Sequence, residues 1–217
     1  MSKPASVIGR RRKAASQDSS ASYQARRKEI CDAAIQVFHR QGFSGASLSA
    51  VAAELGIDRA SLYYYFSSKD ELFDAITTSV LEENAALARR IADSPISPRR
   101  KLRELVAAMM VSYGENYPLL YIYIREDLRH VADSRSEWSE HMRGLNRQIE
   151  NAFIEIIEQG YEDRSLRRIG SARMVAYGIL GMLNWSHRWY RPGKGESAEE
   201  AGRTFAELAL AGLESPY

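Results

Sequence analysis

The sequence of 217 residues contains one cysteine, six prolines and four histidines. A single cysteine, Cys31, excludes a disulfide within the chain and a cysteine-rich metal site, and it fits a reducing cytoplasm. No serine–histidine–aspartate, HExxH or glycine-rich phosphate motif stands out, so we expect no enzymatic activity and no cofactor. We also expect no metal, because each histidine falls in a different predicted helix: His39, His130, His141 and His187.

Long hydrophobic segments are also lacking. The most apolar stretch, residues 174–185, is too short to span a membrane and is flanked by Arg173 and Arg188. No apolar segment follows the basic N-terminus, so we predict no secretory signal. Alternating runs of Val, Ile and Thr are hard to find, which favours an all-α chain over one with strands. We therefore expect a cytoplasmic protein without a membrane partner.

Charge is unevenly distributed along the sequence. Residues 1–28 contain eight Lys and Arg and one Asp, a net charge of +7, whereas the whole chain carries only +2. Residues 1–21 have no apolar periodicity and are predicted to be a disordered basic tail. A basic end on an acidic body indicates a polyanionic partner, although a solvated tail without any contact fits the same composition.

Helical periodicity continues from residue 22 to the C-terminus. We predict nine helices and no strand, with residues 22–70 forming a DNA-binding domain and residues 71–217 a ligand-binding and dimerisation domain. Serines three residues before glutamates, at Ser68 and Ser197, indicate capping boxes that open two of these helices. The expected helices span about 23–41, 48–55, 59–66, 69–91, 98 onward, 118–131, 137–159 (ending at Gly160), 171–190 and 197–213.

Two short helices joined by a tight turn are predicted between residues 47 and 66. Ser47 and Asp58 are placed to cap their N-termini, and Gly56 to end the first of them. On the second helix Leu62 and Phe66 share the buried face, which leaves a polar exposed face. This arrangement is typical of the helix-turn-helix, whose second helix enters the major groove of DNA.

The residues on and beside that exposed face have the chemistry needed to contact DNA. Arg59 can donate two hydrogen bonds to guanine, although contact with phosphate alone fits equally well. The hydroxyl groups of Ser61, Tyr63 and Tyr64 can donate to bases or phosphates. Ser47 and Lys69 begin the helices on either side, where a helix dipole and an ammonium group favour phosphate.

Residues 26–72 resemble the N-terminal signature of the TetR family of bacterial repressors. The resemblance rests on Val51-Ala52, Gly56-Ile57, Ser61-Leu62-Tyr63, Phe66, Lys69 and Leu72 at the spacing of that signature. Tyr65 departs from it, because the family often has histidine there. The resemblance implies phosphate contacts by Ser47, Tyr63 and Lys69, and base or mixed contacts by Arg59, Ala60, Ser61 and Tyr64.

The same resemblance implies a homodimer formed by the last two helices and a C-terminal pocket for a small-molecule effector. The helix at 171–190 is apolar nearly all round and that at 197–213 is amphipathic. The apolar surfaces of both helices cannot easily be buried within one monomer. The turn at 189–193 resembles that of TetR-family regulators of fatty-acid, acyl-CoA or steroid breakdown. Candidate effector contacts, each of which also fits ordinary core packing, are Met109, Tyr113, Tyr121, Tyr123, Trp138, Met142, Met174, Tyr177 and Asn184.

We therefore interpret the chain as a homodimeric repressor that binds a palindromic operator and is released by a small apolar or acyl-type effector. A helical ligand-binding or interaction protein without DNA binding is the alternative, and it would be expected to have an acidic or apolar recognition face. A helical enzyme is a third class, disfavoured because no catalytic set of residues converges.

Overall fold

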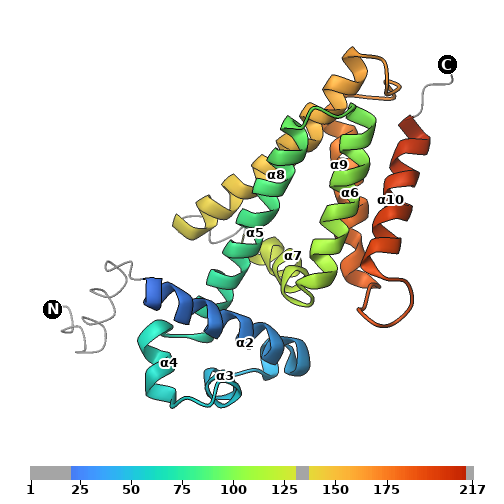
Figure 1. The fold of residues 1–217 in the computed structure, drawn as a ribbon. Coiled ribbons are helices and arrows are strands. Elements are labelled where there is room, and N and C mark those ends of the chain that lie inside the picture. The colour runs from blue at the N-terminus through green and yellow to red at the C-terminus, as the bar shows by residue number, and fades with distance from the viewer. Residues whose placement is uncertain (1–20, 131–136, 214–217) are drawn as a thin grey trace. The chain divides into compact units, whose positions relative to one another are not determined.

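A computed structural model describes residues 21–130 and 137–213, which form an all-α protein (Figure 1). These residues contain nine α-helices, α2 to α10, one short 3-10 helix and no strand, as the sequence predicts. The disorder predicted for residues 1–21 concerns residues that, Ala21 apart, lie outside the described range. None of the described helices is long and apolar enough to cross a membrane. The chain divides into two compact units, residues 1–77 and 78–217.

The first unit is built from three helices and the beginning of a fourth. These are α2 (Ala21–Gly45), α3 (Leu48–Glu54), α4 (Arg59–Tyr65) and the first part of α5 (Lys69–Asp93). Gly42 interrupts α2 with a φ of 70°, which agrees with the helix end predicted there. Each helix contributes apolar side chains to one core, among them Ile30, Val37, Phe38, Val51, Leu62, Phe66 and Leu72.

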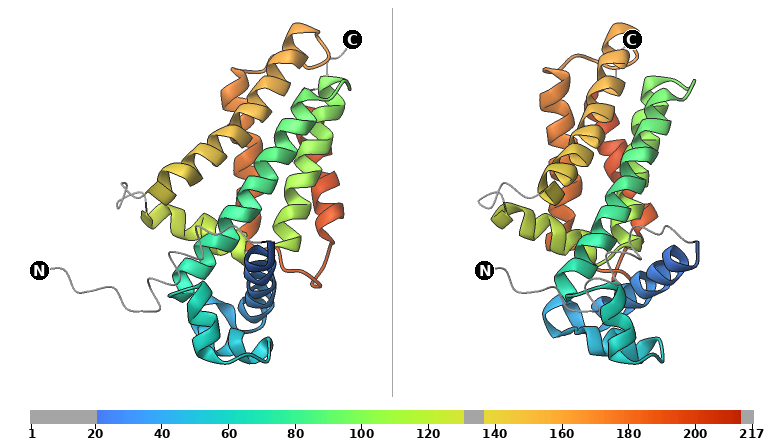
Figure 2. Two further views of the ribbon diagram at one scale, coloured as in Figure 1. Left: turned by 60° about the vertical axis from the view of Figure 1, so that its left-hand side comes forward. Right: turned by 90° about the vertical axis from the view of Figure 1, so that its left-hand side faces the viewer.

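The second unit contains the rest of α5 and five further α-helices. These are α6 (Pro98–Glu115), α7 (Leu119–His130), α8 (Glu137–Glu162), α9 (Ala172–Trp185) and α10 (Ala198–Leu213), with the 3-10 helix η1 (Ser186–Arg188) after α9. Helices α6 and α10 run side by side (Figures 1 and 2). They approach closely at Gly202, where an added Cβ would lie 2.9 Å from the carbonyl oxygen of Ala107.

Both predicted capping boxes open helices, but they differ in detail. At α10 the box is reciprocal, because Glu200 N–H donates to Ser197 Oγ and Ser197 N–H donates to Glu200 Oε2. At α5, Glu71 N–H donates to Ser68 Oγ at 3.0 Å. Its carboxylate instead accepts from the backbone N–H of Ser67, one residue earlier than predicted.

Two predicted helix ends are wrong. Helix α8 continues past Gly160 to Glu162, and the glycine instead makes room for the side chain of Leu166, with which an added Cβ would collide. Helix α9 ends at Trp185 rather than at 190. There His187 Nδ1 lies 2.7 Å from the carbonyl oxygen of Asn184, which an α-helix would offer to residue 188.

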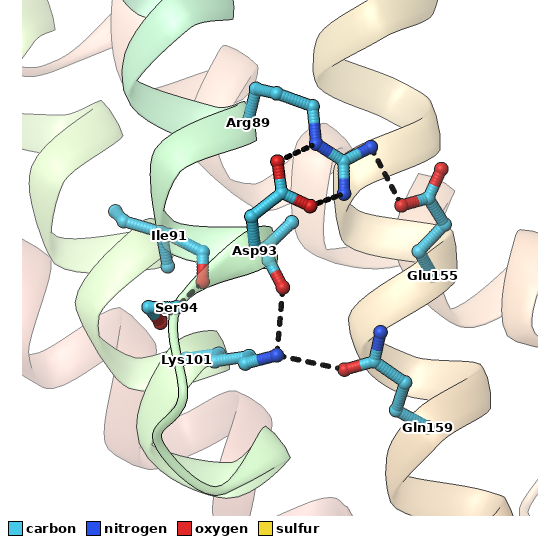
Figure 3. Close-up of polar contacts among 8 residues, drawn as sticks. Arg89, Ile91, Asp93, Ser94, Lys101, Glu155 and Gln159 are labelled. Carbon is cyan, nitrogen blue, oxygen red and sulfur yellow. Dashed lines mark hydrogen bonds and ion pairs between the residues drawn. The ribbon is translucent and has the colours of Figure 1, made fainter.

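A polar cluster fixes the C-terminal end of α5 against α6 and α8 (Figure 3). The side chain of Lys101 is buried, and its ammonium group donates to Ala92 O at 2.7 Å and to Gln159 Oε1 at 2.9 Å. Nearby, the exposed guanidinium of Arg89 bridges Asp93 and Glu155. The lysine places a positive charge beside one of the last carbonyls of α5, where the helix dipole favours it.

Candidate nucleic-acid interface

Helices α3 and α4 form a helix-turn-helix in which both caps have the predicted residues. Ser47 Oγ accepts a hydrogen bond from Ala50 N–H at 3.1 Å, which caps α3. Gly56, at a φ of 63°, ends the helix with the left-handed residue of a Schellman motif, in which Ile57 N–H donates to Ala52 O at 3.0 Å. The turn is therefore followed directly by Asp58, which is the N-cap of α4.

Asp58 holds both polar groups of Ser61. One carboxylate oxygen accepts from Ser61 N–H at 2.8 Å and the other from the Ser61 hydroxyl at 2.5 Å. These hydrogen bonds lower the pKa of Asp58, so the carboxylate is charged at neutral pH. Because the hydroxyl proton of Ser61 is already engaged, this residue presents lone pairs rather than the donor expected from the sequence.

Arg59 and Tyr63, one turn apart on α4, form a pair. Arg59 Nη2 donates to Tyr63 Oη at 2.7 Å, and the guanidinium carbon lies 5.1 Å from the centre of the tyrosine ring. Arg59 is exposed and Tyr63 is half-buried, whereas Leu62 between them is fully buried. The pair therefore lies on the outer face of α4, which the sequence assigns to DNA.

A cluster of three tyrosines joins the start of α2 to the end of α4. The ring of Tyr23, near the start of α2, stacks on Tyr65 at 5.1 Å and meets the edge of Tyr64 at 6.1 Å. Tyr64 is thus half-buried against other aromatic rings rather than free on the surface. Sequence reasoning missed Tyr23, although its position seven residues before Ile30 places it on the buried face of the helix.

Lys69 and Arg27 lie over aromatic rings of the first unit. The ammonium group of Lys69 donates to the carbonyl oxygen of Phe43 at 2.7 Å and lies 4.4 Å from the centre of its ring. The guanidinium of Arg27 lies 4.5 Å from the centre of the Phe66 ring. Lys69 therefore ties the start of α5 to the end of α2, a structural role that the sequence does not indicate.

The second unit brings several of the predicted effector contacts together in neutral hydrogen-bonded pairs. Tyr113 donates to Asn184 at 2.6 Å, and the hydroxyl groups of Tyr121 and Ser186 lie 3.0 Å apart. The rings of Tyr113 and Tyr121 meet edge to face at 6.0 Å. Burial raises the pKa of the Tyr113 hydroxyl far above its usual range and that of Tyr121 to about 12, so both hydroxyl groups are neutral.

A second group of predicted contacts gathers around Thr78. Trp138 Nε1 donates to Thr78 Oγ1 at 3.0 Å, and the same oxygen lies 3.6 Å from the sulfur of Met142. The indole of Trp138 also meets the ring of Tyr123 edge to face, and the Tyr123 hydroxyl accepts from Asn146 at 2.8 Å.

The remaining predicted effector contacts do not join these groups. Met109 is buried, with 2% of its surface exposed, and it belongs to the core. Met174 and Tyr177 are 69% and 45% exposed on α9, so within one chain they face solvent rather than the interior. With them, Trp185 on α9 and Leu208 on α10 are large apolar side chains left exposed.

Residues 30–76 match the bacterial regulatory proteins of the tetR family, and residues 95–213 match the tetracyclin repressor-like C-terminal domain. The chain belongs to the TetR family. It is therefore a DNA-binding transcription regulator, and regulators of this family are as a rule not enzymes.

Similar proteins cover nearly the whole chain. The HTH-type transcriptional repressor KstR2 of Mycobacterium tuberculosis is 28% identical over 189 residues, which span 87% of this chain and 92% of that protein. The solved structure of KstR2, described as a ketosteroid transcriptional regulator, superposes with a TM-score of 0.74 at 26% identity, covering 88% and 95% of the two chains. The TetR-family regulator PfmR of Thermus thermophilus gives a TM-score of 0.73 at 28% identity, covering 86% and 99%.

The geometry also gives a reason for the departure of this chain from the TetR-family signature at Tyr65. Tyrosine at this position can stack on Tyr23 with an interplanar angle of 29°, and it closes the three-ring cluster with Tyr64. The cluster fixes the C-terminal end of α4 to the N-terminal end of α2, from which the basic residues Arg26 and Arg27 follow directly.

Proposed function

We propose that the protein is a homodimeric repressor that binds a palindromic operator through α4 and releases it when a small apolar or acyl-type effector binds. The observation that carries this proposal is the capped helix-turn-helix with the Arg59–Tyr63 pair on its outer face. In this proposal the chain has two domains: residues 22–70 bind DNA, and residues 71–217 bind the partner subunit and the effector. The repressor names of the KstR2 relatives support it.

The proposed DNA contacts follow from the chemistry of the outer face. Arg59 reads a base edge, and Ser61, with its proton held by Asp58, accepts from an amino group of a base. Tyr63, Ser47 and Lys69 contact phosphates; the ammonium of Lys69 has two further N–H groups besides the one donated to Phe43. Ala60 and Tyr64 complete the set with apolar and mixed contacts.

The homodimer is proposed to form through α9 and α10, where large apolar side chains are exposed. Met174, Tyr177 and Trp185 on α9 and Leu208 on α10 would be covered by the same face of a second copy. In the dimer, the two α4 helices would bind two half-sites that lie about one helical turn of DNA apart.

The effector is proposed to contact the neutral pairs of the second unit, Tyr113–Asn184 and Tyr121–Ser186. Uncharged donors and acceptors among aromatic rings match the carbonyl or hydroxyl groups of an apolar ligand. The description of KstR2 as a ketosteroid transcriptional regulator makes a ketosteroid one candidate of this kind. A fatty acyl-coenzyme A is the acyl-type alternative. An effector of either kind acts by favouring a dimer geometry that does not fit the operator.

Nuclease footprinting on the DNA upstream of the protein's own coding region tests this proposal. We expect protection of a site with two inverted half-sites, and shrinking protection when a ketosteroid or a fatty acyl-coenzyme A is added. Light scattering should give the mass of a dimer, and Leu208→Asp should give a monomer that no longer protects the site. A monomeric wild-type protein without any footprint would favour the alternative of a helical protein that does not bind DNA.

A further inference from the structure

Arg59 differs in the kind of its partner from three other cations of the first unit. Arg26, Lys28 and Arg40 each form an ion pair with a carboxylate, on Glu29, Asp32 and Glu54 respectively. Arg59 instead pairs with the neutral hydroxyl of Tyr63, and among the described residues no carboxylate forms an ion pair with it.

The nearest carboxylate in sequence, Asp58, is engaged elsewhere. Both of its oxygens accept hydrogen bonds from Ser61, one from the backbone and one from the hydroxyl. This arrangement caps α4 without neutralising the neighbouring guanidinium. Arg59 is thus held in place while its full charge remains available for DNA.

The contact with Tyr63 restricts where the guanidinium can point. A free arginine loses much side-chain entropy when its fork is fixed on a base. Here one nitrogen already donates to Tyr63 Oη at 2.7 Å, and the ring lies beneath the guanidinium at 5.1 Å. Tyr63 has only two side-chain torsions and follows the fully buried Leu62, so it is a stiff support.

We propose that Tyr63 is a positioning residue for base recognition by Arg59, in addition to any contact with phosphate. Its oxygen accepts from Arg59, which leaves its own O–H free to donate to a phosphate oxygen. Both contacts use the Tyr63 hydroxyl. When this hydroxyl binds a DNA phosphate, it therefore also fixes the guanidinium of Arg59 over the base edges. This inference rests on the proposed function, in which α4 lies in the major groove.

The test begins with selection of duplexes from a randomised DNA pool by the wild-type protein. Affinity is then measured by fluorescence anisotropy on the selected duplex and on one in which the guanine preferred at the Arg59 position is replaced. We expect wild type to prefer the guanine by about tenfold or more, and Arg59→Ala to lose that preference. Tyr63→Phe, which keeps the ring but removes the oxygen, should reduce the preference to about threefold or less.

Two variants serve as controls. Tyr65→Phe removes a hydroxyl from the same helix at a residue outside the proposed DNA contacts, keeps the ring that stacks on Tyr23, and should keep the wild-type preference. Arg59→Lys keeps the charge without the fork, so it should lose the preference while keeping the salt dependence of binding. Circular dichroism of each variant checks that the helices are intact.

Each other outcome overturns the inference in a distinguishable way. Equal weakening on both duplexes by Tyr63→Phe means that Tyr63 contacts phosphate only. Loss of the preference in Tyr65→Phe as well means that the effect is a general distortion of α4. If Arg59→Ala keeps the preference, Arg59 does not read the base, although DNA binding stands. Only failure of the wild-type protein to select any duplex counts against the proposed function itself.

Discussion

The ammonium group of Lys69, on the first residue of α5, donates a hydrogen bond of 2.7 Å to the carbonyl oxygen of Phe43 at the end of α2. The same group lies over the Phe43 ring, 4.4 Å from its centre. The lysine therefore satisfies a backbone carbonyl just after the break at Gly42, and it connects α5 to α2 through two residues that are 26 positions apart.

Lys69→Met should therefore destabilise the protein even without DNA. We expect a loss of about 1–3 kcal/mol in the free energy of unfolding, because the Phe43 carbonyl loses a charged donor. Denaturant unfolding measures this loss, with the exposed Lys28→Met as control, where the change should stay within about 0.5 kcal/mol. A phosphate contact by Lys69 adds a second effect, a decrease of about two in the salt slope of DNA binding, because the dimer loses one such contact in each subunit. An unchanged stability would show that the Phe43 contact contributes nothing.

The glycines of α10 predict opposite effects of the same substitution. Gly202→Ala places a Cβ 2.9 Å from the backbone oxygen of Ala107, so α6 and α10 must separate, at a cost of about 1–3 kcal/mol. Gly212→Ala meets no atom within 4 Å and should stabilise the helix by up to about 1 kcal/mol. Thermal unfolding of the two variants compares them directly. Similar melting temperatures would mean that the two helices do not pack this closely.

The buried Lys101 offers a prediction for the end of α5 shown in Figure 3. Lys101→Met keeps the volume of the side chain but removes the hydrogen bonds to Ala92 and Gln159, and it should cost about 2–4 kcal/mol. The neighbouring Arg100→Met removes only an exposed pair with Glu104 and should change stability by less than about 0.5 kcal/mol. Urea unfolding of both variants tests this difference, and equal stabilities would contradict the role of Lys101.

Cys31 should react slowly in the folded protein. Burial raises the pKa of its thiol from 9.0 to about 11. At pH 8 the folded protein then contains about a hundredfold less thiolate than the unfolded chain, and reaction with a disulfide reagent slows accordingly. Because the folded-state pKa is the higher one, this thiol also makes stability fall as the pH rises from about 9 toward 11. Rapid labelling of the native protein at pH 8 would contradict this environment.

Much of the first unit follows from its sequence because local rules fix it. The caps at Ser47 and Asp58, the left-handed Gly56 and the buried pair Leu62 and Phe66 depend on residues within one or two turns of each other. The partners of Lys69 and Tyr23 could not be predicted in the same way. Phe43 lies 26 residues before Lys69, and only the folded chain brings the two together.

Less of the second unit can be predicted from its sequence, because its contacts join residues that lie far apart in the sequence. Helical periodicity predicts α6 and α10. The helix end predicted at Gly160 is wrong, because the packing of this glycine against Leu166 depends on a turn that follows the helix. The pairs Tyr113–Asn184 and Trp138–Thr78 join residues 71 and 60 positions apart. Which side chains meet inside a helical unit depends on how the helices pack, and periodicity alone gives only the buried face.

The salt dependence of DNA binding tests the central claim most directly. Fluorescence anisotropy with the full-length protein and a labelled duplex from its own upstream region should show saturable binding. Raising the salt from about 50 to about 200 mM should weaken binding at least about tenfold, because the cationic side chains of Arg59 and Lys69 and of their symmetry mates displace counterions condensed on the DNA. Arg59→Ala should bind more weakly at every salt concentration. Wild-type protein that shows no saturable, salt-sensitive binding to any fragment of that region would contradict the account.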